Sequence, residues 1–256
     1  MRRFVKNGDG SRGFSLVELL VVVAIIVILL ALLLPSARRM REKALETQCM
    51  ANMRSLQHAH TTYSADNDGE MPGAQTSARS RKYDWVHYTN SDNLELQKEN
   101  LRVGSLWEYL NDYAVYHCPR YPRDIRFQFH VRHYSLNNYL NGNGWGYPVK
   151  KTVGAVPKPA ETLSFIEEPD PRKGLAGSWV TEGRDGKDKK DGWVDPIGFW
   201  HSNGAVFAFL DGHIEKRPWY DARTLAVGFS FFANTPNNPD LQWIKAHSCP
   251  GDPLAP

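Results

Sequence analysis

Residues 14–34 form an apolar run that one carboxylate, Glu18, interrupts near its start. About 20 apolar residues in a helix match the ~30 Å hydrocarbon core of a bilayer. An ionised carboxylate in such a helix costs free energy unless it reaches the interface or a cation pairs with it. The sequence therefore predicts a membrane-spanning helix in which Glu18 needs a positive partner.

The charge ahead of this run predicts its orientation. Residues 1–13 contain four basic residues and one acidic residue, so their net charge of +3 equals the formal charge of the whole chain. Positive residues before a first hydrophobic helix stay in the cytoplasm. We expect a single-pass protein of the cytoplasmic (inner) membrane, with its C-terminal part in the periplasm or outside the cell. The neutral remainder argues against a dedicated nucleic-acid binder, which needs lysine and arginine at phosphates.

The stretch GFSLVEL at residues 13–19 resembles the processing motif of type IV pilins and type II secretion pseudopilins. The resemblance implies that a prepilin peptidase cleaves between Gly13 and Phe14 and methylates the new amine. It also implies that the Phe14 amine of a neighbouring subunit is the cation that pairs with Glu18. The implied partners are the peptidase, other pilin-like subunits and a pilus or secretion assembly platform. An uncleaved signal anchor is the simpler alternative.

Four segments follow from these observations: a leader at 1–13, a transmembrane and assembly helix at 14–34, a helical continuation at 35–65 and a globular head at 66–256. The continuation carries a stripe of mainly apolar residues spaced by three or four, as on one helix face: Leu45, Cys49, Met53, Leu56, His60 and Tyr63. This stripe needs a covering partner. We predict an α+β fold in which the helix packs on an antiparallel β-sheet head with long loops, as in pilins.

Alternating or apolar stretches predict strands at 126–134, 162–167, 205–210 and 213–217, and a short helix at 106–113. The last two strands flank Asp211-Gly212, which suits a two-residue hairpin turn because glycine accepts positive φ. Long segments rich in glycine, proline, aspartate and asparagine separate these elements and are expected to be loops.

His201 precedes Asp211-Gly212 by nine residues, which resembles the H-x9-DG signature of large sets of pilin-like proteins. His201 and Asp211 are a conceivable base and orienter, and His201 with Glu167 or Glu168 is another arrangement that a hydrolase would use. The favoured interpretation is structural, with His201 hydrogen-bonded to a loop and Asp211 chosen for its turn. No P-loop, G-x-S-x-G or H-E-x-x-H motif is present, so we predict that the protein is not an enzyme.

Calcium is the one cofactor that the sequence suggests. Asp66, Asp68 and Glu70 alternate around a glycine, as at the front of an EF-hand loop, but the twelfth position is Gln75 instead of a bidentate glutamate. The alternative is an acidic turn that ends the long helix.

Three cysteines in an exported domain permit one disulfide. Cys118 and Cys249 both precede proline in loop-like surroundings, whereas Cys49 lies on the apolar stripe, where a thiol can serve as a small hydrophobe. The residues alone mildly favour Cys118 with Cys249. The family resemblance instead implies Cys49 with Cys118.

These observations together predict a pilin-like or pseudopilin structural subunit that assembles into a type IV pilus-like or type II secretion-type filament. The alternative is a membrane-tethered ligand- or carbohydrate-binding module. Its stacking platforms would be tryptophans in the loops: Trp85, Trp145, Trp179 and Trp193.

Overall fold

The computed structural model describes residues 15–74, 81–89, 91–122, 130–143, 148–169, 177–181 and 192–248. It contains two compact units, residues 1–44 and 45–256, which are considered separately below. Gly13, Phe14, Gln75, Trp145 and Cys249 lie outside the described residues.

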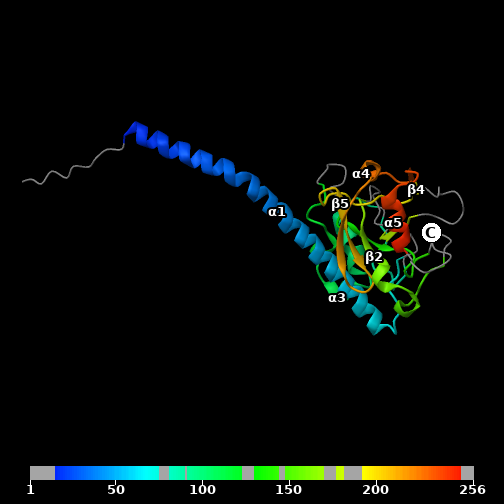
Figure 1. Ribbon diagram of the computed structural model, residues 1–256. Coiled ribbons are helices and arrows are strands. Elements are labelled where there is room, and N and C mark those ends of the chain that lie inside the picture. Colours follow the sequence, from blue (N-terminus) through cyan, green and yellow to red (C-terminus); the bar gives the residue numbers. More distant parts are fainter. Residues whose placement is uncertain are drawn as a thin grey trace, which may run out of the picture. The chain divides into compact units, whose positions relative to one another are not determined.

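Helix α1 (Leu16–Asp66) begins two residues after the predicted cleavage site and continues through Pro35. Among the described residues, it is the one helix long and apolar enough to cross a membrane. Its large apolar side chains between Leu16 and Leu34 are exposed, as expected for side chains whose natural surroundings are lipid. The predicted membrane helix and its continuation are thus one element (Figure 1).

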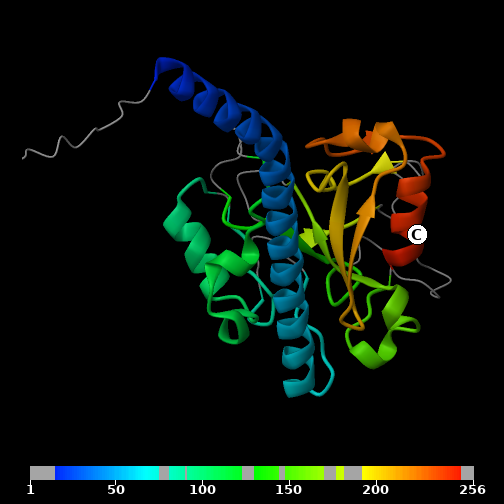
Figure 2. The ribbon, with the colours of Figure 1, turned by 60° about the vertical axis from the view of Figure 1, so that its left-hand side comes forward.

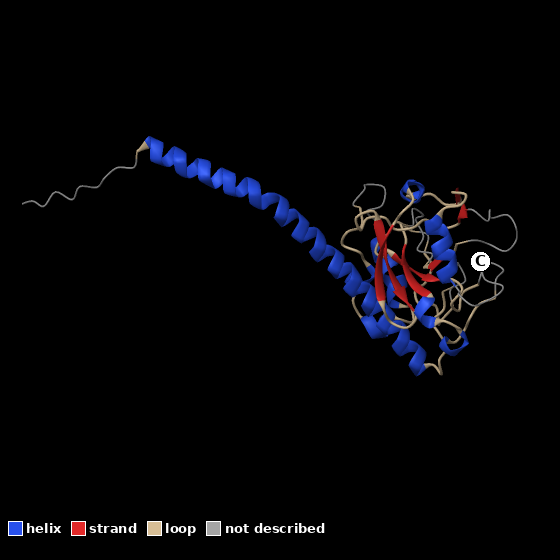
Figure 3. Ribbon diagram, in the orientation of Figure 1, coloured by secondary structure: helices blue, strands red, loops and turns tan. Residues whose placement is uncertain are grey.

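The head contains a five-stranded sheet of order β3-β1-β2-β5-β6 and a two-stranded sheet of β4 and β7 (Figure 3). The strands of the larger sheet are β1 (Tyr134–Asn137), β2 (Leu163–Glu167), β3 (Ser178–Trp179), β5 (Gly204–Phe209) and β6 (Ile214–Pro218). The smaller sheet pairs β4 (Gly192–Trp193) with β7 (Ala233–Asn234). The helices after α1 are α2 (Leu94–Arg102), α3 (Trp107–Leu110), α4 (Ala222–Val227) and α5 (Pro239–Ser248), and the 3-10 turns are η1 (Tyr113–Tyr116), η4 (Val153–Ala155) and η5 (Pro159–Glu161).

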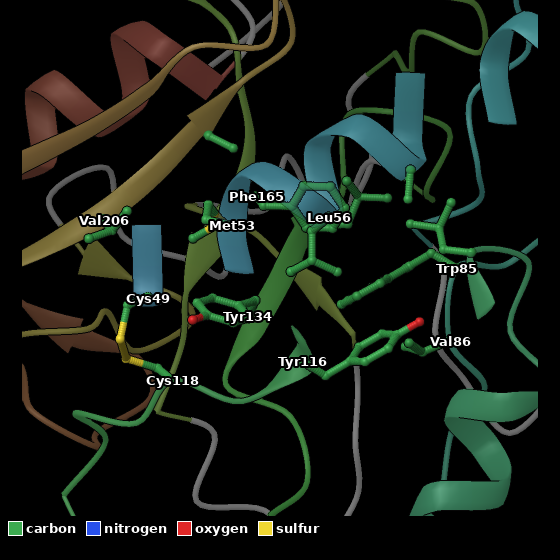
Figure 4. Packing of buried hydrophobic residues seen from close by; sticks show 14 of the residues in the cluster. Cys49, Met53, Leu56, Trp85, Val86, Tyr116, Cys118, Tyr134, Phe165 and Val206 are labelled. Carbon is green, nitrogen blue, oxygen red and sulfur yellow. A yellow bond between two sulfur atoms is a disulfide. The ribbon is translucent and has the colours of Figure 1, made fainter. Parts of the chain in front are cut away.

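The part of α1 after Leu45 packs on one face of the larger sheet (Figure 2). Cys49, Met53 and Leu56 are fully buried there, in one apolar cluster with Phe165 of β2 and Val206 of β5 (Figure 4). From Cys49 to Leu56 the stripe read from the sequence is therefore covered by the sheet, as predicted, whereas Leu45 is half-buried. Because these side chains leave water only when helix and sheet meet, their burial stabilises both elements together.

The opposite face of the sheet is covered by α5 and by indole rings. Phe207 of β5 lies in a second apolar cluster with Trp193, Trp219 and Ile244. The sheet is thus buried on both faces, and β5 has all six of its residues buried. This explains why its sequence is apolar at nearly every position instead of alternating.

Several predicted details differ from the structure. The sheet is mixed, because β1 runs parallel to β3 while its other pairs are antiparallel. The strand predicted at 126–134 is wrong over 130–133, since β1 begins at Tyr134, and residues 126–129 lie outside the described part. The helix predicted at 106–113 covers only Trp107–Leu110, because Asn111 adopts a left-handed conformation and ends it. The strands predicted at 162–167, 205–210 and 213–217 are confirmed within one residue.

The β5–β6 hairpin has a three-residue loop instead of the predicted two. Phe209 N–H donates to the carbonyl of His213, so residues 210–212 form the loop, and Gly212 has φ +105°. A third loop residue in the left-handed region lets a right-handed type I turn close on twisted strands. Gly212 therefore occupies the position for which a side chain is most costly.

His60 is a fully buried histidine on α1, and neither of its ring nitrogens has a hydrogen-bond partner among the described residues. Its ring meets Phe165 edge-on at 6.0 Å between centroids. Burial lowers its pKa from 6.5 to about 3. The folded head thus keeps this imidazole neutral at any pH near neutrality.

We expect the head to lose stability in acid through His60. Below pH 6.5 the unfolded chain binds a proton at this histidine and the folded chain does not. The free energy of unfolding therefore falls by about 1.4 kcal/mol for each pH unit. As the pH is lowered from 7.5 to 5, the free energy of unfolding of His60→Leu relative to that of wild type should rise by about 2 kcal/mol. Urea unfolding at each pH measures this difference. The matched control is His58→Leu, since His58 is exposed on the same helix. A difference between His60→Leu and wild type that does not vary with pH would contradict this account.

Candidate functional site

The first turn of α1 contains a reciprocal pair of hydrogen bonds. Ser15 N–H donates to Glu18 Oε2 at 2.9 Å, and Val17 N–H donates to Ser15 Oγ at 3.3 Å. Together they resemble a capping box, in which two orphan amides at a helix start are satisfied by side chains. The S-x-x-E spacing at residues 15–18 is a local signal for this arrangement, which was not predicted from the processing motif. Glu18 thus has a local partner within its own chain.

Glu18 is exposed and lies at the positive end of the helix dipole. Only one of its carboxylate oxygens receives the Ser15 amide. A carboxylate can accept several hydrogen bonds, so capping and pairing with an external cation are compatible.

The H-x9-DG residues occupy the two ends of one hairpin strand. His201 precedes β5, and Asp211-Gly212 follows it. Six strand residues at ~3.3 Å each separate them by about 20 Å, so His201 and Asp211 do not form a catalytic pair. Asp211 Oδ1 instead accepts the His213 amide at 3.1 Å and lies 2.7 Å from His213 Nδ1. The nine residues between His201 and Asp211 are the two turn residues Ser202 and Asn203, the six residues of β5 and Leu210.

His201 is positioned by a strained turn. Ser202 and Asn203 both have positive φ (54° and 59°), and His201 N–H donates to the carbonyl of Gly204. Two successive positive φ values define a type I′ turn. Serine rarely adopts this conformation, and such strain persists only where surrounding structure enforces it. The strain in this turn therefore indicates that the surrounding structure fixes the position of His201.

The side chain of His201 pairs with Glu167 on β2. Their Nε2 and Oε1 atoms are 2.8 Å apart, and both side chains are fully buried. Glu167 Oε2 accepts the amide of Val206 at 2.9 Å. The expected hydrogen bond of His201 to a loop is therefore wrong for its side chain, since Glu167 lies in a strand. Glu168 is held elsewhere, by the hydroxyl of Ser135.

The surroundings of this pair exclude water. Burial, and secondarily the charge of Glu167, raises the pKa of Tyr134 well above its usual value. Burial likewise lowers the pKa of His133 well below 6.5. A catalytic base needs hydrogen-bond reach to its substrate, and a pair with no exposed surface gives none. The His201–Glu167 pair is a structural group in this conformation.

A disulfide joins Cys49 of α1 to Cys118, which follows η1 (Figure 4). Their Cα atoms are 5.1 Å apart and both residues are fully buried. This is the pairing that the family resemblance implies, and it makes the alternative of Cys118 with Cys249 wrong. The bond fixes the covered part of α1 to the segment that leads into the sheet.

The acidic residues considered for calcium surround the end of α1. Asp66 Oδ2 accepts a hydrogen bond from the Tyr109 hydroxyl at 3.0 Å, and Asp68 has a left-handed φ of 53°. Gly69 N–H donates to the carbonyl of Ser64, as in a Schellman cap. Glu70 forms an isolated bridge with Thr152. Asp68 and Gly69 thus end the helix, Asp66 and Glu70 have partners in the head, and calcium binding remains an expectation from the sequence.

Three of the four tryptophans considered for ligand stacking are in the core, and Trp145 lies outside the described residues. Trp85, Trp179 and Trp193 have no exposed surface, so they cannot stack on a ligand in this conformation. A cavity of about 580 Å³ lies elsewhere in the head, and its lining includes Tyr63, Tyr83 and Trp107 together with Arg102 and Glu108. These aromatic and charged side chains come from α1, α2, α3 and the segment before α2, so no local pattern in the sequence indicates the group.

Comparison with known proteins identifies the N-terminal segment. Residues 9–34 match the model of the prokaryotic N-terminal methylation motif. Together with the one long apolar helix found among the described residues, this motif fits a membrane-anchored protein. More particularly, it fits a type IV pilin or pseudopilin precursor, which confirms the resemblance seen in residues 13–19. No curated protein and no solved structure matches the chain.

Proposed function

We propose that the protein is a pilin-like or pseudopilin structural subunit that a prepilin peptidase processes and that assembles into a pilus-like or secretion-type filament. The observation that carries the proposal is the methylation motif at the start of an apolar helix with exposed side chains. A helix of this kind first lies in the membrane and then packs against equivalent helices. In the filament, the Glu18 carboxylate of each subunit would pair with the Phe14 amine of a neighbouring subunit.

The head supports this role by its construction. The disulfide and the apolar cluster hold the covered part of α1 against the sheet. A filament transmits force from the helical core to the heads, and a covalent bond at that junction resists separation. The head would then serve as the outward surface of the filament, without a catalytic function of its own.

The tethered ligand-binding module remains the second candidate, and one observation favours it. The cavity lined by Tyr63, Tyr83 and Trp107 combines aromatic faces with charged groups, as sites for polar ligands do. A simple tether would require neither the cleavage site nor the charge of Glu18. Processing and assembly experiments therefore separate the two candidates.

We predict that the mature chain begins at Phe14 with a methylated amine when the protein is made in cells with a prepilin peptidase. Mass spectrometry of the membrane-extracted protein measures this directly. Gly13→Val should retain the leader, because a β-branched side chain obstructs access to the scissile bond. The control Gly10→Val changes a glycine of the same leader away from that bond and should be cleaved normally. A leader that remains on the wild-type protein would overturn the proposed processing.

A further inference from the structure

Four side chains with metal-binding atoms converge beneath the sheet face that covers α1. They are Cys49, Cys118, Glu167 and His201, and one ligand atom from each lies within 4.8 Å of all the others. All four residues have no exposed surface. They come from α1, the segment after η1, β2 and the turn before β5, so the fold brings them together from distant parts of the chain.

We propose that the thiol form of this protein binds one Zn²⁺ ion through Cys49, Cys118, Glu167 and His201, at the place where the disulfide lies in the oxidised form. Zinc takes four ligands in a tetrahedron, and thiolate, imidazole and carboxylate are its protein ligands. With Zn–S bonds of about 2.3 Å, the two sulfurs need a separation of about 3.8 Å. The four ligand atoms already lie within 4.8 Å of one another, and reduction of the disulfide frees the two sulfurs to separate to the required distance.

The groups around the four ligands suit this site. Trp200 Nε1–H donates to Cys118 Sγ at 3.3 Å, and N–H donors to sulfur stabilise a thiolate. Glu167 Oε2 is held by the Val206 amide, which leaves Oε1 for the metal. His201 Nε2 already faces both Glu167 Oε1 and Cys118 Sγ, at 2.8 and 3.4 Å. Outer hydrogen bonds of this kind orient ligands and tune metal affinity.

The ring of His201 adds an independent observation. Its Nδ1 atom is buried and has no hydrogen-bond partner among the described residues. The polar contacts of the ring with the described residues are therefore made through Nε2, with Cys118 Sγ and Glu167 Oε1. The strained turn at Ser202 and Asn203 holds the ring in this place. A disulfide needs no neighbouring imidazole and carboxylate, whereas a zinc ion needs both to complete its coordination.

The two forms interconvert by balanced chemistry. A disulfide-containing oxidant takes two electrons from the zinc dithiolate, which gives the Cys49–Cys118 bond, free Zn²⁺ and two thiolates of the reduced oxidant. In reverse, a thiol reductant converts the disulfide to two thiols, and Zn²⁺ displaces their two protons. Thiols persist in the reducing cytoplasm and disulfides in the oxidising compartments outside it. The zinc form would thus belong to reducing conditions, and the disulfide form to oxidising ones.

The test uses the full chain in detergent, with Cys249 replaced by serine so that no third thiol binds metal. The protein is unfolded, reduced with a trialkylphosphine and refolded without oxygen, with and without one equivalent of Zn²⁺. We expect one bound zinc ion per reduced chain after dialysis, and none per oxidised chain. Binding of zinc by the oxidised chain, or its absence from the reduced chain, would overturn the proposal.

Variants identify the ligands. His201→Gln and Glu167→Gln remove direct ligands, so they should weaken zinc binding by the reduced chain by more than the roughly tenfold loss typical of changes to outer-shell partners. The matched controls His213→Gln and Glu161→Gln alter residues outside the cluster and should bind zinc as the parent does. Unchanged affinity of both cluster variants would overturn the assignment.

A measurement on the unaltered ligand set removes the dependence on variant folding. Co²⁺ bound to the reduced chain should give the intense visible absorption of a tetrahedral site together with sulfur-to-cobalt charge-transfer bands that correspond to two thiolates. The weak absorption of six-coordinate cobalt, or the lack of charge-transfer bands, would contradict coordination by the two cysteines.

Discussion

Replacing Glu18 by valine is expected to abolish incorporation of the protein into filaments while leaving membrane insertion and leader cleavage intact. The substitution makes the membrane helix more apolar, so insertion is favoured. It removes the one carboxylate that can pair with a neighbouring Phe14 amine. Loss of one partner of a buried ion pair costs about 3–5 kcal/mol, so recovery in assemblies should fall by well over tenfold. Crosslinking or co-isolation with other pilin-like subunits of the same cell measures this recovery.

The capping geometry provides a matched variant that separates two roles of Glu18. Glu18→Gln removes the charge but keeps an oxygen that can accept the Ser15 amide, as glutamine does in a capping box. If Glu18 pairs with a cation, glutamine and valine should both prevent assembly. If Glu18 only caps the helix, glutamine should assemble as wild type does and valine alone should fail. Equal recovery of all three proteins would refute the filament-subunit proposal and favour the tether.

The sequence predicted those parts of the fold that depend on local periodicity. The apolar run follows from composition and the stripe from Leu45 to Tyr63 follows from helical spacing, and α1 contains the stripe and the run from Leu16 onward. The hairpin of β5 and β6 follows from an apolar stretch before Asp211-Gly212. In these cases the residues that determine the element lie within it, so a single sequence contains the necessary information.

The parts that the sequence did not predict depend on contacts between distant residues. Nothing near Ser178 indicates that β3 runs parallel to β1, because that pairing joins segments about 40 residues apart. The sequence left the side-chain partner of His201 open between Glu167 and Glu168, since adjacent residues along a strand point to opposite faces and the register decides which one faces His201. The choice among three cysteines likewise required the position of α1 on the sheet.

The capping pair of Ser15 and Glu18 is a different case, because its signal was local. The processing motif implies a partner for Glu18 on a neighbouring subunit. The S-x-x-E spacing within the same residues indicates a second partner, within the chain itself. The structure gives Glu18 a partner in its own chain at 2.9 Å. One residue can thus satisfy a helix end before assembly and still offer its charge afterwards.

Removing the disulfide is expected to cause a large loss of stability in the head. The Cys49–Cys118 bond spans 69 positions of the sequence, and closing a loop of that size restricts the unfolded chain by about 4 kcal/mol at 25 °C in the chain-entropy model. A head of this size has a total stability of about 5–15 kcal/mol. The double variant Cys49→Ala/Cys118→Ala should therefore unfold at much lower urea concentration, as followed by circular dichroism of the full chain in detergent.

Two conditions make this measurement specific. A chelator keeps free metal away, because an ion that binds only the folded state would add to its stability. Cys249→Ala is the matched control and should unfold as wild type does, since Cys118 is bonded to Cys49.

Each alanine also removes a buried sulfur, so part of the loss arises from packing. Wild type unfolded in the presence of a reductant separates the two contributions, because reduction breaks the bond and leaves both sulfurs in place. Equal midpoints for reduced and oxidised wild type would show that the sheet and apolar cluster hold α1 without the covalent bond.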